Sequence, residues 1–148
     1  MSIHELLYLR NFQFVEVALL ITRLLIGSCF VVHGLGKLGI VGPGNMKGFE
    51  QWLASMNLPM PALQARLAML AELLGGSLVA LGFMTRFGCL LCFSTMIVAG
   101  LIGHKGGGYL ITNNPPGNEY TINLAIICVL IFALGGGSYS IDSWFFAG

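Results

Sequence analysis

Ionisable side chains inside otherwise apolar stretches are the first candidates for chemistry in this 148-residue chain. Arg23, His33, Lys37 and Glu72 all lie within, or at the end of, long hydrophobic runs. An ionisable group in the hydrocarbon of a membrane costs about 2.5–3.5 kcal/mol on insertion scales, so each one requires an inward direction and a partner. We therefore take these residues as candidates for a functional site or for ion pairs between helices.

Several of these groups are expected at nearly the same depth. His33 and Lys37 close one apolar run, and Glu72 lies about 8 Å inside the start of the next at 1.5 Å per residue. Because consecutive spans meet at one membrane surface, we expect a polar pocket there, under the two long connections. Basic groups can donate hydrogen bonds to a ligand, and a carboxylate can accept or orient a proton. The residues expected to form this ligand-binding pocket are His33, Lys37, Glu72, Arg66, His104, Glu119 and Asn123.

Helical periodicity gives these groups a direction. At about 100° per residue, Gly27 shares a face with Arg23 and Lys37, and Gly76 shares a face with Glu72. Small residues let helices approach closely in lipid, so the two faces are predicted contact faces. Glu72 is therefore expected to point into the bundle rather than toward lipid.

A structural role is the alternative for every one of these groups, because buried ion pairs can hold helices in register. For Arg23 and Arg86, near the surface opposite the pocket, we favour this structural interpretation. For His33, Lys37 and Glu72 both interpretations stay open. These three ionisable groups at one depth are more than the register of the helices alone requires.

Cysteine chemistry and metal binding are not predicted. Cys89 and Cys92 form a C-x-x-C pattern, but they lie in an unbroken apolar run, where thiols stay protonated and behave as small hydrophobic groups. The sequence contains no set of residues with the spacing of a zinc site, no nucleotide-binding loop and no nucleophile elbow. We assign no metal site.

The hydrophobic composition of the chain predicts that membrane-spanning helices position these residues. The chain is 56% hydrophobic and 9% charged, with a mean hydropathy of +0.85, which leaves too little polar surface for a water-soluble domain. A helix needs at least about 17 mostly apolar residues to span a bilayer. We predict an all-α integral membrane four-helix bundle, in a single domain covering residues 1–148. The predicted spans cover about residues 15–37, 67–84, 87–103 and 120–137.

The first long connection is expected to contain a short amphipathic helix. Phe49, Trp52, Leu53 and Met56 fall on one helical face, and Pro59 ends the pattern. We expect this helix to lie in the membrane interface. The alternative is a lid of ordinary core packing over the mouth of the bundle.

The remaining connections define the topology. A tight turn around Thr85 and Arg86 is predicted to join the second and third spans as an antiparallel hairpin. The connection 104–119 is rich in Gly, Asn and Pro, which predicts turns. An even number of spans places both termini on one side of the membrane, and basic residues weakly favour the long loops in the cytoplasm. The N-terminus lacks a cleavage site and is expected to be retained.

Five short motifs stand in a characteristic order along the chain: Arg23–Gly27, His33–Leu38, Glu72–Gly76, Leu81–Arg86 and Gly136–Asp142. Together they resemble the DoxX family of bacterial and archaeal membrane proteins. The resemblance implies a multi-pass protein of the bacterial cytoplasmic (inner) membrane. Some family members are associated with quinone-linked oxidation of sulfur compounds, and others with oxidoreductase or redox-stress complexes. The recurrent polar positions of the family correspond here to Arg23, His33, Lys37, Glu72 and Arg86.

Two functional hypotheses follow. In the first, the chain is a membrane subunit of a quinone-linked oxidoreductase, in which His33 and Lys37 donate to the ring carbonyls and Glu72 acts as proton acceptor or orienter. No ligands for haem, flavin or an iron–sulfur cluster are evident, so other electron carriers are expected in partner subunits. In the second, the chain is a non-enzymatic membrane module that binds a small molecule or assembles partners. The net charge of +1 and the absence of a basic patch exclude nucleic acid binding. Catalytic activity, substrate and homo-oligomerisation stay open.

Overall fold

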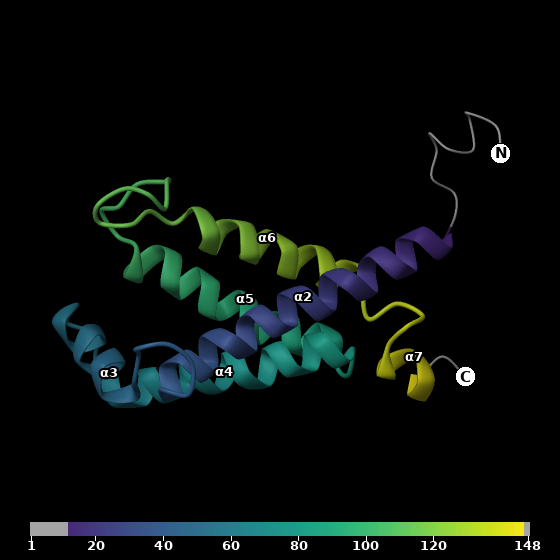
Figure 1. Cartoon of the computed structure of the whole chain (residues 1–148), viewed down its shortest axis with the longest axis horizontal. Coiled ribbons are helices and arrows are strands. Elements are labelled where there is room, and N and C mark those ends of the chain that lie inside the picture. Colours follow the sequence, from purple (N-terminus) through teal and green to yellow (C-terminus); the bar gives the residue numbers. More distant parts are fainter. Residues whose placement is uncertain (1–11, 147–148) are drawn as a thin grey trace.

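The computed structural model describes residues 12–146, all of whose regular structure is helical. Figure 1 shows four long helices running lengthwise, with α3 and the loop 104–118 at one end and α7 at the other. The all-α prediction is confirmed. The N-terminal segment, for which retention is expected, lies outside the described residues. The helices are α2 (Phe12–Leu38), α3 (Met46–Ser55), α4 (Pro61–Leu81), α5 (Thr85–Val98) with a π-helical turn Ala99–Gly103, α6 (Glu119–Leu134) and α7 (Ile141–Phe146).

Helix lengths agree with a membrane protein, with corrections at the ends. Three helices, at 13–38, 61–81 and 85–103, are long and apolar enough to cross a membrane, and α6 is a shorter apolar helix of 16 residues. The second span begins at Pro61 rather than near 67, because proline is well suited to the first turn of a helix. The helix at the fourth predicted span, α6, ends at Leu134 rather than near 137, because Gly135 follows with a φ of 79°.

The turn between α4 and α5 also differs from the prediction. It lies at 82–84, and Thr85 and Arg86 are the first residues of α5 rather than the turn itself. The cause is a distant cap. Asp142 accepts hydrogen bonds from the backbone N–H of Met84 (2.6 Å) and from the backbone N–H (2.9 Å) and Oγ1 (2.7 Å) of Thr85. These bonds satisfy the otherwise free N–H groups at the start of α5.

Adjacent glycines make α4 the central helix. A Cβ at Gly76 would lie 2.6 Å from the carbonyl oxygen of Gly27 in α2, and a Cβ at Gly75 would lie 3.0 Å from the carbonyl oxygen of Gly88 in α5. Such close backbone approach is typical of helix pairs in lipid. The predicted contact faces of α2 and α4 are therefore confirmed, and Glu72 lies about one turn from these glycines, pointing inward with 4% exposure.

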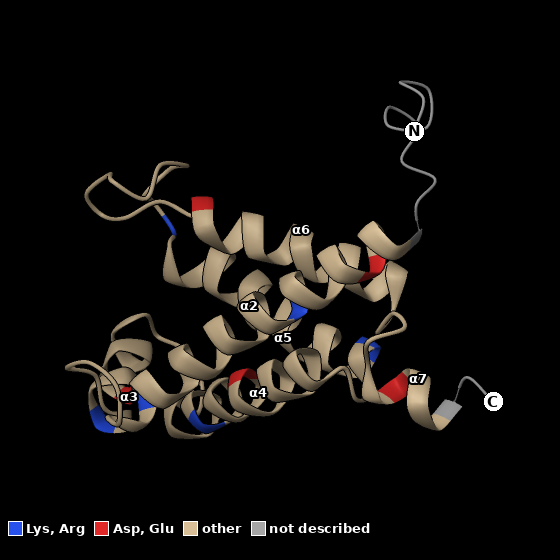
Figure 2. Cartoon of the chain, turned by 45° about the vertical axis from the view of Figure 1, so that its right-hand side comes forward, with Lys and Arg blue, Asp and Glu red and all other residues tan. Residues whose placement is uncertain are grey.

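The interior is small and apolar, and the cysteines belong to it. Cys92 and Cys128 pack in one cluster with Phe30 and Met96, and Cys89 lies in a second cluster. All four cysteines are free thiols. Many large apolar side chains are exposed along the helices, as expected for surfaces that face lipid. Figure 2 shows charged residues mostly toward the two ends of the bundle, with few along its middle.

Both arginines assigned a structural role bond backbone carbonyls in the C-terminal part of the chain. Arg23 is fully buried, and its Nη2 donates to the carbonyl oxygen of Tyr139 at 2.5 Å. Arg86 is exposed, and its Nε donates to the carbonyl oxygen of Phe132 at 3.1 Å. These contacts tie α2 to the C-terminal segment and α5 to the end of α6, in line with the structural interpretation.

Candidate functional site

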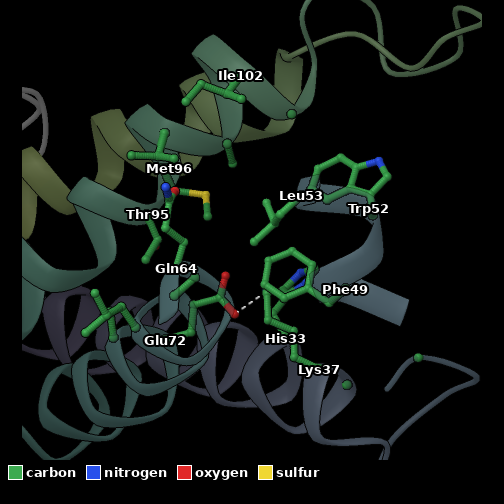
Figure 3. A pocket seen from close by; sticks show the side chains of 18 of the residues that line it. His33, Lys37, Phe49, Trp52, Leu53, Gln64, Glu72, Thr95, Met96 and Ile102 are labelled. Atoms are coloured by element: carbon green, nitrogen blue, oxygen red, sulfur yellow. Dashed lines mark hydrogen bonds and ion pairs between the residues drawn. The ribbon is translucent and has the colours of Figure 1, made fainter. Parts of the chain in front are cut away.

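A pocket with a volume of about 880 Å³ lies between α2, α3, α4 and α5 at the end of the bundle that carries the long connections. Its size falls within the roughly 300–1,000 Å³ typical of small-molecule sites. Figure 3 shows Glu72 and Lys37 on one side of the space, and Phe49 and Trp52 of α3 on another. Most of the lining is apolar, so the few polar groups determine what the pocket can recognise.

The strongest polar feature is an ion pair between α2 and α4. Lys37 Nζ donates to Glu72 Oε2 at 2.5 Å, and the side chains are 18% and 6% exposed. Lys37 lies in the last turn of α2, where its positive charge also interacts favourably with the helix dipole. The ring of Phe49 lies 5.1 Å from Nζ, within cation–π range. The ammonium is thus held by a carboxylate and an aromatic face at the pocket wall.

A second polar group lies where α5 and α6 meet the long loop. The rings of His33 and His104 both contact Tyr120, with centroids 6.2 Å and 5.3 Å away. His104 Nδ1 lies 3.0 Å from the carbonyl oxygen of Pro116. Because a carbonyl can only accept, Nδ1 is the donor of this bond, which fixes the His104 ring against the loop. All three rings belong to residues that line the pocket.

Some of the predicted site residues are brought together and others are not. His33, Lys37, Glu72 and His104 line the pocket, as the sequence predicts. The lining does not include the other three. Arg66 and Asn123 are exposed on their helices, and Glu119 turns to the loop, where its Oε2 accepts from the backbone N–H of Ile111 at 3.1 Å. Glu119 therefore orders the loop rather than the pocket.

Tyr120 lines the pocket although it is not among the residues predicted for the site. It follows Glu119 directly, in the first turn of α6. The signal was available in the helical pattern. Thr121, Ala125 and Cys128 are the buried face of α6, and Tyr120 lies beside that face. An inward-facing tyrosine in the first turn of α6 meets the end of α5.

The amphipathic helix of the first long connection is confirmed as α3, although it ends at Ser55, just before Met56. Its apolar residues Phe49, Trp52 and Leu53, together with Met56, line the pocket. Asn45 caps the helix, accepting from the backbone N–H of Gly48 at 2.8 Å. The apolar face of α3 therefore covers the pocket, which favours the lid interpretation of this helix.

The arrangement favours a neutral, largely apolar ligand. Lys37 and Glu72 neutralise one another, so an anionic or cationic ligand would have to separate them. Among residues 12–146, no group of three or more His, Cys, Asp or Glu side chains could hold a metal ion. Hydrogen-bonding groups in two places, with apolar walls between them, suit a molecule that carries polar atoms at more than one position.

Comparison with known proteins places this site in context. The sequence profile of the DoxX family matches residues 18–105, which contain Lys37, Glu72 and the whole of α3. The chain is also similar to the inner membrane protein YphA of Escherichia coli (strain K12), with 32% identity over 133 residues, covering 85% of this chain and 89% of the relative. No solved structure matches the chain.

Proposed function

The chain belongs to the DoxX family, and from that premise we propose that it is a quinone-binding membrane subunit of an oxidoreductase or redox-stress complex. We place it in the bacterial inner membrane, which the name of its relative supports. The observation that carries the proposal is the Lys37–Glu72 pair at the wall of a largely apolar pocket. The orientation with the long loops in the cytoplasm stays a prediction.

A quinone suits the chemistry of these walls. Its ring and tail are apolar, and its carbonyl oxygens accept hydrogen bonds. The Lys37 ammonium has further N–H donors besides the one given to Glu72, and the Tyr120 hydroxyl is another donor at the pocket. An interaction of this kind needs no net charge on the ligand, so the ion pair stays intact when the ligand binds.

The role we propose for Glu72 is proton transfer to and from the quinone. Reduction of a quinone to a quinol takes up two electrons in total and one proton at each of its two carbonyl oxygens. A buried carboxylate beside a lysine can accept or return a proton at the ring, which is the usual work of a general acid or base. We assign the electron transfer to a partner subunit, and the chain described here binds the quinone and handles its protons.

A second function follows from the same pair. Lys37 and Glu72 join α2 to α4, and an ion pair that is complete within the chain can serve helix register alone. In that case the protein is a non-enzymatic membrane module that binds another apolar molecule or assembles partner proteins. Both functions use the same fold, so a direct search for the ligand is needed to separate them.

The test is to purify the protein in mild detergent, extract it with organic solvent and quantify quinone per protein by mass spectrometry. The variants are Glu72→Gln and His33→Ala, with Arg66→Gln as the matched control, because Arg66 is an exposed charge outside the pocket. We expect quinone in the wild type and in Arg66→Gln, and loss in folded Glu72→Gln. Folded wild-type protein without quinone, or equal retention in all variants, would overturn the proposal in favour of the module.

A further inference from the structure

The helix that covers the pocket is attached more loosely than the spans. Leu53 is the one buried residue of α3. In the described part of the chain, the hydrogen bonds made by α3 stay within residues 45–58. Side-chain packing therefore holds α3 over the pocket, and α3 can lift away without losing a hydrogen bond to the spans.

α3 packs mainly against α4 through its apolar face, and its aromatic side chains add contacts to α2 and to the π-helical turn. A Cβ added at Gly103 would lie 2.9 Å from Cη2 of Trp52, so the indole edge rests directly on the backbone of the π-helical turn. The rings of Phe49 and Trp52 stack with centroids 5.8 Å apart, and Phe49 also covers the Lys37 ammonium. Trp52 remains 45% exposed, so it contacts the bundle along one edge.

Both connections of α3 contain backbone suited to hinges. Gly39 and Gly42, with φ of 79° and 72°, precede the helix, and a Cβ at Gly42 would meet nothing within 4 Å. Asn57 and Met60, with φ of 58° and 49°, follow it. Hinges are a few loop residues at element ends that absorb changes in backbone angles. The two segments that would have to move are thus located on either side of α3.

We infer that α3 is a gate, that residues 39–45 and 56–60 are its hinges, and that the contact of Trp52 with Gly103 is the latch that closes the pocket. Opening the latch exposes the Lys37–Glu72 wall to a ligand that arrives from the membrane surface, and closing it shields the ion pair from water. The inference rests on the proposed function only for the identity of that ligand.

The test measures access to the pocket without any quinone. Thr95, which lines the pocket, is replaced by Cys in a Cys29→Ser background, because the other three native thiols are buried. N-ethylmaleimide, a small neutral reagent, then labels this position, and mass spectrometry follows the rate. Gly103→Ala adds a methyl group against the indole edge without enlarging the pocket. We expect about tenfold faster labelling, the change produced by a loss of about 1.4 kcal/mol from the closed state.

A double-mutant cycle tests whether the contact of Trp52 with Gly103 is the cause of the faster labelling. Phe is shorter than Trp, so in a Trp52→Phe protein the methyl group of Gly103→Ala has room and is expected to leave the labelling rate unchanged. Trp144→Ala is the matched control, because Trp144 lies in α7 at the opposite end of the molecule (Figure 1), and it is expected to label like the parent. A Gly103→Ala effect that is absent would show that α3 is a fixed wall, and an effect equal in both backgrounds would show that the Trp52–Gly103 contact is not the latch.

Failure of the gate and failure of the proposed function give different results. If the labelling cycle succeeds and no quinone binds, the gate serves another apolar ligand. If quinone binds and Gly103→Ala changes its affinity rather than raising association and dissociation rates by the same factor, Trp52 is a binding residue and the gate is overturned.

Discussion

Lys37 and Glu72 meet although they lie at different distances from the close contact between Gly27 of α2 and Gly76 of α4. Lys37 follows Gly27 by nearly three turns of α2, whereas Glu72 precedes Gly76 by about one turn of α4. The helices are antiparallel, and Cβ atoms tilt toward the N-terminus of their own helix. Lys37 therefore leans inward from the surface and Glu72 leans outward, so that their charged atoms close to 2.5 Å.

This geometry predicts different results for single and double substitutions. Lys37→Met or Glu72→Gln alone leaves one buried charge or polar group without its partner, and we expect a loss of roughly 3–5 kcal/mol in unfolding free energy. The double variant Lys37→Met/Glu72→Gln should recover most of that stability. Thermal unfolding in mild detergent measures both.

Quinone retention in the same variants separates function from register. If the pair serves the ligand, the double variant is stable but carries no quinone. A stable double variant that retains quinone at the wild-type level would contradict a ligand role for both residues.

The backbone contact of α2 with α4 should tolerate no added side chain. Gly76→Ala places a Cβ 2.6 Å from the carbonyl oxygen of Gly27, which forces the helices apart. We expect a loss of about 1–3 kcal/mol in stability, the usual range for overpacking. Gly36→Ala is the matched control, because its nearest contact is at 3.5 Å. Equal unfolding temperatures for the two variants would show that the close approach is not required.

Asp142 predicts a pH dependence at the other end of the bundle. Partial burial acts to raise its pKa, but hydrogen bonds from Thr85 and Met84 prevail and hold the pKa below its ordinary value. A depressed pKa in the folded state means that the carboxylate stabilises the fold above the unfolded-state pKa of about 3.9. This contribution is lost as the pH falls through the lower pKa of the folded protein.

The comparison with Asp142→Asn measures this contribution. At neutral pH we expect the variant to be less stable by about 1–3 kcal/mol, because charge-assisted hydrogen bonds to the start of α5 are weakened. The difference between wild type and variant should shrink in thermal unfolding experiments below about pH 4. A difference that stays constant on acidification would argue against a charged Asp142 as the cap.

The burial of Arg23 gives a prediction for the C-terminal segment. Its Nη2 donates to the carbonyl oxygen of Tyr139, and its Nε and Nη1 have no hydrogen-bond partner among the described residues. Arg23→Met removes a bond that holds this segment, so limited proteolysis should cut near Tyr139 several times faster. Arg86→Met is the control, because Arg86 is exposed and bonds Phe132 instead. Equal cleavage of both variants would show that the Arg23 bond does not secure the segment.

Local patterns in the sequence predicted much of the fold. Runs of apolar residues located the long helices, and the periodicity of Gly27, Gly76 and Glu72 oriented α2 and α4 correctly, because both features depend only on residues close in sequence. The turn before α5 was misplaced because its cap, Asp142, comes from the far end of the chain. Sequence spacing contains no information on such a contact.

The candidate site was predicted in part for the same reason. His33, Lys37, Glu72 and His104 could be assigned to one end of the bundle from depth alone, and all four line the pocket. Depth does not reveal which way a side chain at a helix end turns. The side chain of Glu119 points to the loop, where it accepts a hydrogen bond from the backbone N–H of Ile111, whereas the neighbouring Tyr120 points into the pocket.

The two tryptophans of the chain allow the most direct test of the central claim. Trp52 lines the pocket, whereas Trp144 lies at the opposite end, so Trp144→Phe leaves a reporter in the pocket and Trp52→Phe leaves a distant one. Quinones quench tryptophan fluorescence on contact, and a short-tailed quinone is titrated into both variants. The account predicts saturable quenching of Trp52 alone, weakened about tenfold or more by Glu72→Gln, the equivalent of roughly 1.4 kcal/mol. Equal, non-saturating quenching of both tryptophans would contradict a quinone site in this pocket.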